Sequence, residues 1–404
     1  MEPAQIVKTM QNGMGNMLGF VATVVGLGAM FGAILEHTGG ARSIADFTLS
    51  KMGIKQAPLA MALSGFIIAI PVFFDVAFII LTPIIYALQR KTGKSLLLYA
   101  IPLLAGLAIT HTFIPPTPGP VAVADIMNVG LGQVILVGAI AGIPTLIICG
   151  LLFGKFIAGR IHIEAPPEAE AEDVKPANLP PVGLIFFIVA TPIILILLNT
   201  LVSSGLLEIA ETAPSAQAIS LLGHPFTALI ISNLLAWYLL GRRHGLNKEQ
   251  LFEITTKSMA PAGTIILLTG AGGVFKQVLV DTKAGEMLAN LVMGTGIPLI
   301  CFAFVTAALI RIMQGSATVA MLTAATLVAP LVAAELPQFQ IACLVIAIAS
   351  GASILSHVND SGFWLVGQYL RMTEKQTAAS WTVMTTLLAL TGFATAWLLS
   401  ILAA

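Results

Sequence analysis

Charged residues are scarce in this 404-residue chain. Only 9% of the residues are Asp, Glu, Lys or Arg, whereas 57% are hydrophobic and the mean hydropathy is +0.96. A soluble domain carries about 25% charged residues. The composition therefore predicts a polytopic membrane protein, and a formal net charge of zero gives no indication of nucleic-acid binding.

Cysteine is also rare. The three cysteines, Cys149, Cys301 and Cys343, lie far apart inside apolar runs, where a small apolar side chain is the ordinary choice. Their spacing fits neither a disulfide framework nor a metal site, and we expect no cofactor. The opening "MEPAQIVKTMQNGMGN" lacks the apolar core of a cleavable signal peptide, so the first membrane span is expected to begin near Met17.

Long apolar runs predict membrane-spanning helices, because about 20 apolar residues are needed to cross a bilayer. Such runs occupy residues 17–35, 132–155, 182–202, 217–240, 261–281 and 377–401. The "GAGG" at 270–273 has no strand before it and predicts close helix packing instead of a nucleotide loop. The one clearly polar linker, residues 159–181, is rich in Pro and acidic residues and is expected to be flexible.

Four other apolar segments are interrupted. Residues 57–89 and 297–334 each contain two short arms joined by a tip, "PVFFD" and "RIMQGSATV" respectively. The first arm would be only about 21 Å long as a helix, which is short for a crossing, so both segments predict re-entrant hairpins. Residues 95–128 and 338–368 predict spans broken at "THTFIPPTPGP" and "SHVNDSGF".

The interruptions occur at matching positions in two halves of the chain. Lys and Arg cluster at 90–94 and 241–248, which places both clusters on the cytoplasmic side. Residues 1–158 and 251–404 then form inverted repeats, separated by a soluble linker at 159–181 and connecting transmembrane helices at 182–250. This all-α arrangement of inverted-topology repeats, with re-entrant hairpins and broken transmembrane helices, is typical of secondary transporters.

The broken helices predict a binding site. Irregular backbone survives at membrane depth where it lines a cavity or contacts a ligand, and a helix that restarts after a break carries partial positive charge at its N-terminus, where a carboxylate can bind. The predicted substrate-binding residues are Thr110, Thr112, Thr117, Pro118, Gly119, Gln314, Gly315, Ser316, Thr318, Ser356, Asn359, Ser361 and Gly362. Their hydroxyls and amides would suit a polyhydroxylated ligand.

Titratable residues at the same breaks are candidates for proton coupling: Asp75, His111, His357 and Asp360. An acid inside a membrane is costly and usually functional, although Asp75 could also cap a hairpin, and each histidine could cap helix-end carbonyls. Asp360 fits a helix N-cap. Arg311 could either snorkel towards the interface or meet an anionic substrate.

The motifs at these breaks resemble those of the gluconate permease family, the gluconate:proton symporters of the wider ion-transporter superfamily. The resemblance runs from about residue 10 to the end and is carried by "FFDVAF" (73–78), "THTFIPPTPGPVAVA" (110–124), "GGVFKQVLVD" (272–281), "RIMQGSATVA" (311–320) and "SHVNDSGFWL" (356–365). It implies uptake of gluconate or another sugar acid with protons across a bacterial inner membrane. It further implies an elevator-type transport domain in a homodimer.

Two departures from the family pattern are visible. The resemblance implies further apolar segments before "MGNMLGF", and a glutamate where this chain has Asp75. The family also moves other small hydroxy or amino acids, such as D-glycerate or D-serine, so the substrate stays open.

Three rival functions are weaker. A sodium-coupled carboxylate transporter needs two Ser-Asn-Thr-type tips, and only "QGSAT" approximates one. An intramembrane hydrolase built on Asp75 and Asp360 lacks the motifs of that chemistry, so we expect no enzyme. A passive channel would be excluded by accumulation of substrate against a gradient.

Overall fold

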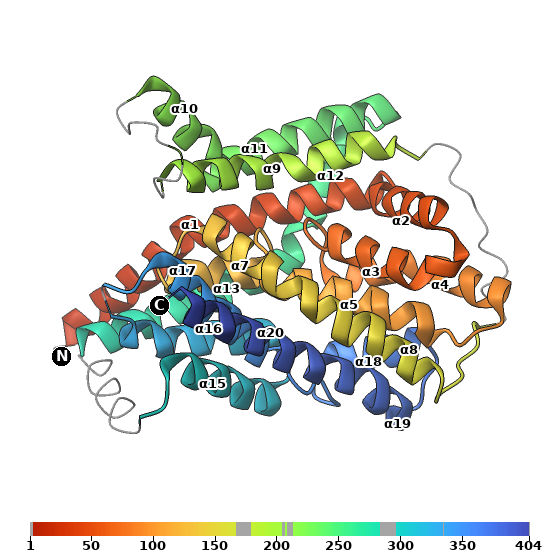
Figure 1. The fold of residues 1–404 in the computed structure, drawn as a ribbon. Coiled ribbons are helices and arrows are strands. Elements are labelled where there is room, and N and C mark those ends of the chain that lie inside the picture. Colours follow the sequence, from red (N-terminus) through yellow and green to blue (C-terminus); the bar gives the residue numbers. More distant parts are fainter. Residues whose placement is uncertain are drawn as a thin grey trace.

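The structure, a computed structural model, describes residues 3–166, 179–203, 207, 213–282, 296–333 and 335–403. Within these ranges the chain is helical and contains no β-strand, and the long helices run side by side as a bundle (Figure 1). Among the described residues, five helical runs are long and apolar enough to cross a membrane: Gln5–His37, Leu97–Ile126, Leu131–Ala158, Val182–Ser203 and Glu374–Leu402. The predicted all-helical membrane fold is confirmed at this level.

The first half of the chain forms eight α-helices. They are α1 (Pro3–His37), α2 (Gly40–Met52), α3 (Ala57–Ile68), α4 (Phe74–Thr92), α5 (Leu97–Phe113), α6 (Pro118–Ile126), α7 (Leu131–Thr145) and α8 (Phe153–Ala158). A π-helical stretch, Leu146–Leu152, makes α7 and α8 continuous. The middle of the chain forms α9 (Val182–Ser203), α10 (Pro214–Gly223), α11 (Pro225–Leu235) and α12 (Lys248–Lys257).

The second half forms seven α-helices within its described residues. It forms α13 (Met259–Asp281), α15 (Leu299–Gln314), α16 (Ala317–Val328), α17 (Gln338–Gly351), α18 (Ser361–Tyr369), α19 (Glu374–Thr377) and α20 (Val383–Leu402). Residues 283–295, between α13 and α15, lie outside the described residues.

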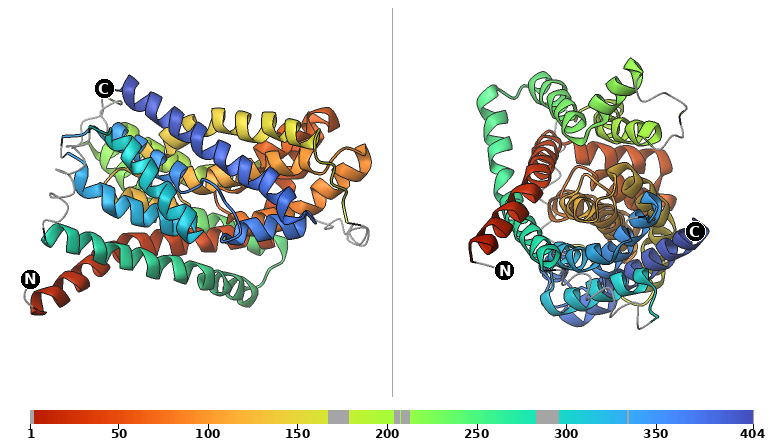
Figure 2. Two further views of the ribbon diagram at one scale, coloured as in Figure 1. Left: turned by 90° about the horizontal axis from the view of Figure 1, so that it is seen from below. Right: turned by 90° about the vertical axis from the view of Figure 1, so that its left-hand side faces the viewer.

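The helices α5 and α6 lie at the centre of the bundle. In the most apolar window of this span 83% of the residues are buried, against 28% in the spans formed by α9 and by α19 to α20. The end-on view in Figure 2 shows other helices around this centre. A helix that is apolar on all sides and buried belongs to a core, which fits α5 and α6. The apolar spans of α9 and α20 are much less buried, so these helices have faces available for lipid.

Glycines allow the main helix crossings. A Cβ on Gly273 would lie 2.4 Å from the carbonyl oxygen of Gly13, so α13 and α1 touch backbone to backbone. A Cβ on Gly106 would lie 2.3 Å from the oxygen of Ala62, which brings α5 against α3. Only a residue without a side chain permits such an approach. The packing role predicted for "GAGG" is therefore confirmed at Gly273.

The chain is interrupted where the sequence predicts interruptions. Residues 69–73 separate α3 from α4, Gly315 and Ser316 separate α15 from α16, and residues 114–117 and 352–360 divide the two broken spans. Gly315 has a φ of 80°, a left-handed conformation that glycine adopts without strain. The prolines before α6 cannot donate the hydrogen bonds that would continue α5.

Two predicted boundaries are wrong. The helix α1 begins at Pro3, well before Met17, because α13 packs along its polar first turns: the Thr9 hydroxyl donates a 2.5 Å hydrogen bond to Asp281. The predicted span 217–240 is bent by 66° between α10 and α11. Pro225 begins α11 and has no N–H to continue α10, and the ring of His224 accepts a hydrogen bond from the Phe226 N–H.

The described ends of the polar linker are held to the first half. The Arg90 guanidinium donates to the carbonyl of Pro166 over 2.9 Å, and the Leu96 N–H donates to Ile163 over 2.8 Å. At the other end, Ser43 donates to Pro180 over 2.8 Å. The flexibility predicted for residues 159–181 therefore does not extend to these ends, and residues 167–178 lie outside the described residues.

The glycine crossing of α3 and α5 gives a first prediction. Gly106→Ala should lower the stability of the purified protein by about 1–3 kcal/mol, because the added methyl group overlaps the backbone of α3. Thermal unfolding in detergent measures the change. Gly19→Ala is the matched control, since a Cβ there meets nothing within 4 Å and alanine is the better helix former. Equal melting temperatures for the two variants would contradict the proposed crossing.

Candidate functional site

Three of the four breaks meet at one cavity. It has a volume of about 520 Å³, within the range of small-molecule sites. Its wall includes the start of α4, the end of α5, the tip between α15 and α16, the loop before α18, and one face of the last helix. The polar residues in this wall are Asp75, His111, Thr112, Arg311, Gln314, Ser316, Thr318, Ser353, Asn359, Asp360, Ser361, Trp381 and Thr385.

Three helices begin at the cavity. Phe73 precedes α4 without a side-chain cap, Ser316 accepts a hydrogen bond from the Val319 N–H at the start of α16, and Asp360 accepts one from the Gly362 N–H at the start of α18. The first turns of a helix present N–H groups with partial positive charge. The cavity wall is therefore favourable for an anion, although Asp360 already occupies the end of α18.

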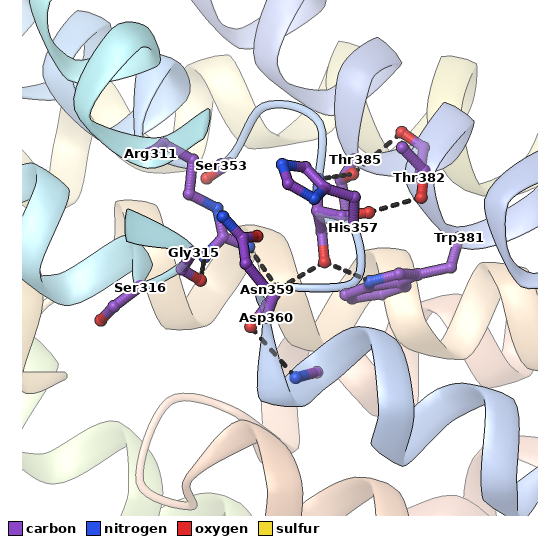
Figure 3. Close-up of polar contacts among 12 residues, drawn as sticks. Arg311, Gly315, Ser316, Ser353, His357, Asn359, Asp360, Trp381, Thr382 and Thr385 are labelled. Atoms are coloured by element: carbon purple, nitrogen blue, oxygen red, sulfur yellow. Dashed lines mark hydrogen bonds and ion pairs between the residues drawn. The ribbon is translucent and has the colours of Figure 1, made fainter. Parts of the chain in front are cut away.

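A buried ion pair joins the second hairpin tip to the second broken span. The guanidinium of Arg311, only 5% exposed, donates to the Asp360 carboxylate and to the Gly315 carbonyl (Figure 3). Asp360 also accepts from Ser356, whose oxygen accepts a 2.6 Å hydrogen bond from the Trp381 indole. Arg311 therefore neither snorkels nor stands free for a ligand: its charge is balanced by Asp360.

The loop before α18 also closes against the end of α15. The Asn359 amide donates to the carbonyl of Ile312 over 2.9 Å, and His357 Nε2 lies 3.2 Å from the same oxygen. A Cβ on Gly315 would lie 2.2 Å from the Asn359 carbonyl oxygen, so only glycine fits at this contact. These bonds satisfy a carbonyl that α15 leaves without a helical partner at its C-terminal end.

Two titratable groups in the first half are different, because they lack partners. Asp75 lies in the first turn of α4, is exposed to the cavity, and makes no hydrogen bond or ion pair with the described residues. His111 lies near the end of α5, with its ring edge-on to Phe73 and the ring centres 6.3 Å apart. Its Nδ1 is buried and has no hydrogen-bond partner among the described residues. A buried polar atom without a partner is costly.

The structure brings eleven of the predicted residues to the cavity wall. They are Asp75, His111, Thr112, Gln314, Gly315, Ser316, Thr318, Asn359, Asp360, Ser361 and Gly362.

Six predicted residues do not line the cavity. Thr110 is fully buried and donates to the Phe66 carbonyl over 2.7 Å, and Thr117 donates to the Ile114 carbonyl over 2.7 Å. Pro118 and Gly119 begin α6, where a Cβ on Gly119 would lie 2.4 Å from the methyl group of Met321. Ser356 and His357 lie behind the wall and are occupied by the bonds described above. The start of α6 packs against α16 and α1 instead of opening into the cavity.

The last helix also contributes to the cavity wall, which its apolar sequence did not predict. Trp381, Thr385 and Leu388 line the cavity, yet they belong to a stretch that was predicted to be an ordinary span. The signal was present in "SWTVMTT" at 380–386, where one Trp and three Thr interrupt an apolar run. The aromatic pair Phe73 and Phe74 at the first tip also faces the cavity and was not selected.

A family comparison agrees with this architecture. The model of the family described as GntP family permease matches residues 1–402. The chain belongs to this family. The low-affinity gluconate transporter of Escherichia coli (strain K12) is 41% identical over 389 residues, which cover 96% of this chain and 86% of that relative.

Further relatives are nearly as similar. The gluconate permease of Pseudomonas aeruginosa is 37% identical over 98% of this chain and 88% of its own length. The Gnt-II system L-idonate transporter of Escherichia coli (strain K12) is 36% identical over 97% of this chain and 88% of its own length.

A solved structure shares the fold. The crystal structure of the Alcanivorax borkumensis YdaH transporter, whose topology is described as unusual, matches with a TM-score of 0.66, covering 100% of this chain and 90% of that one at 15% identity. The family membership confirms three predictions. The chain belongs to the family that its motifs resemble, it is a transporter and not an enzyme, and it is located in a bacterial inner membrane.

The buried ion pair gives a second prediction. Arg311→Gln should destabilise the protein by about 3–5 kcal/mol, because it leaves the Asp360 carboxylate, 12% exposed, without its cation. The double variant Arg311→Gln/Asp360→Asn should cost less than the sum of the single variants. Thermal unfolding of the four proteins measures the coupling. Additive losses would show that the two side chains do not interact.

Proposed function

We propose that the protein imports gluconate or a closely related sugar acid together with protons. The observation that carries this proposal is the pairing, in one cavity, of helix N-termini with an unpartnered carboxylate and an unpartnered imidazole. Helix N-termini suit the carboxylate of a substrate, and an intramembrane acid suits a proton. The names of the relatives, which include gluconate and L-idonate transporters, point to the same substrate class.

The substrate carboxylate would lie at the start of α16. The start of α16 has only a 3.4 Å side-chain cap, which the Ser316 oxygen accepts from the Val319 N–H. Unlike the uncapped start of α4, it has no acidic residue in its first turn that would repel a carboxylate. Amides and hydroxyls around it can meet a chain of hydroxyl groups: Thr112, Gln314, Thr318, Asn359 and Ser361. The aromatic rings of Phe73, Phe74 and Trp381 would cover the carbon chain.

Asp75 is the first candidate for the proton, and His111 the second. Both reach the cavity wall without a hydrogen bond to the described residues. His357 and Asp360 are weaker candidates, because one is bound to Ile312 and the other is paired with Arg311. A group that must gain and lose a proton during transport needs access to the cavity and no permanent counter-charge.

The same proposal includes an elevator-type movement of inverted repeats. Residues 1–158 and 251–404 would be the two repeats, with 182–250 as connecting helices. In support, α6 and α18 each have 9 residues, and α15 meets α17 through Gly351 much as α3 meets α5 through Gly106. The segments α3–α4 and α15–α16 would be re-entrant hairpins, and the transporter would work as a homodimer.

Proton coupling leads to a third prediction. In proteoliposomes, an inward proton gradient should drive accumulation of labelled gluconate, and a protonophore should abolish it. Accumulation that follows a sodium gradient and ignores the protonophore would identify the rival sodium-coupled mechanism. Unlabelled D-glycerate and D-serine, added in excess, test the alternative substrates, since the true substrate competes best.

The role of Asp75 leads to a fourth prediction. Asp75→Asn should reduce proton-driven accumulation at least about 100-fold, whereas exchange of internal for external substrate should persist, because exchange needs no net proton movement. Asp75→Glu keeps the carboxylate and should retain coupled uptake. Loss of exchange together with uptake in Asp75→Asn would assign this residue to substrate binding instead of coupling.

A further inference from the structure

A second cavity lies at the end of the bundle that carries the lysine-rich loops. Its volume is about 690 Å³. Lys55 comes from the turn before α3, Lys94 from the loop before α5, and Lys155 from α8. The positive-inside rule places this end in the cytoplasm. Three separate elements therefore direct ammonium groups to one concave site that has no place in the proposed transport path.

The charge of this cavity is not balanced. All three lysines are exposed, and none forms an ion pair with a described residue. The acid Glu164 lies 3.8 Å from His162, which also lines the cavity, but Glu164 itself is not in the wall. The Ser95 side chain, which also lines the cavity, is held by the Ile161 carbonyl over 2.8 Å. The cavity thus has a fixed floor and a net positive charge.

The same cavity includes an apolar groove beside the lysines. Its residues come from α3, α5 and the run from the π-helix to α8, and these elements pack against one another. Leu59, Leu98 and Leu151 line it beside the lysines. On the run from the π-helix to α8, the side chains of Leu152 and Phe156 are 62% and 51% exposed, as expected for a surface in contact with lipid. A soluble ion would use the lysines but would gain nothing from this groove.

We propose that this cavity binds an anionic phospholipid. The lipid phosphate is held by Lys55, Lys94 and Lys155, and one acyl chain lies in the groove between α3 and α8. Basic pockets between transmembrane helices on the cytoplasmic side recognise anionic headgroups in this way. A bound lipid would bridge α3, α5 and α8, and so would stabilise the first half of the chain independently of substrate.

Native mass spectrometry of the full-length protein in a neutral detergent tests this proposal. Phosphatidylglycerol should bind more tightly than phosphatidylcholine with the same acyl chains. Each Lys→Gln change should lower the affinity about fivefold, and Lys55→Gln/Lys94→Gln/Lys155→Gln about a hundredfold. The triple Lys→Arg variant should bind like the unchanged protein, which shows that the fold tolerates substitution at these positions.

Two controls make the test decisive. The variant Lys51→Gln/Lys91→Gln/Lys375→Gln removes the same charge from exposed lysines outside the cavity and should leave lipid binding unchanged. If this variant lost as much affinity as the triple cavity variant, general electrostatics would explain the binding and the proposal would be overturned. Ala158→Phe fills the groove and should weaken phosphatidylglycerol binding without altering charge. If inorganic phosphate displaces the lipid and Ala158→Phe has no effect, the site recognises a soluble anion and the lipid assignment is wrong.

Discussion

The need to satisfy backbone polar groups at membrane depth determines how this protein is built. Each break in a helix exposes N–H and C=O groups that lipid cannot bind. The loop before α18 illustrates the solution: the Ser356 N–H is bound by Thr385, and the Val358 carbonyl accepts from Trp364. Trp364 comes from α18, which continues the loop, and Thr385 comes from α20, so this break depends on a helix from elsewhere in the chain as well as on its own. The cavity is a consequence of this dependence, because polar groups gather where the breaks meet.

The same constraint explains the buried ion pair. A single charge in this environment would be far more costly than a neutral side chain, so Arg311 requires Asp360. The pair connects the tip between α15 and α16 to the start of α18, which are 49 positions apart in the chain. Gly315 then brings the backbone of the tip against Asn359. Separating the tip from α18 would expose two charges at once, and the two elements therefore behave as one unit in any rearrangement.

The breaks in the helices could be predicted from the residues next to them, whereas the packing between the breaks could not be predicted. The proline cluster before α6 and the Asp360 N-cap depend on neighbouring residues, and both are readable from a short stretch of sequence. The direction in which α6 begins depends on Met321, about 200 positions away, so the sequence could not show that Pro118 and Gly119 lie away from the cavity. For the same reason Trp381 was overlooked, since a helix that lines a cavity on one face has nearly the hydropathy of one that does not.

The two halves contribute different properties to the cavity. In the second half every charged group at the break is already bound: Arg311 to Asp360, and Asp360 also to Ser356. In the first half Asp75 and His111 reach the same space without such bonds. A group with a permanent partner fixes geometry, whereas a group without one can respond to a ligand or a proton. In the proposed mechanism the second half serves as the rigid wall of the cavity, and the first half carries the groups whose protonation can change. The two halves thus differ in electrostatics at the cavity, and the proposed mechanism depends on that difference.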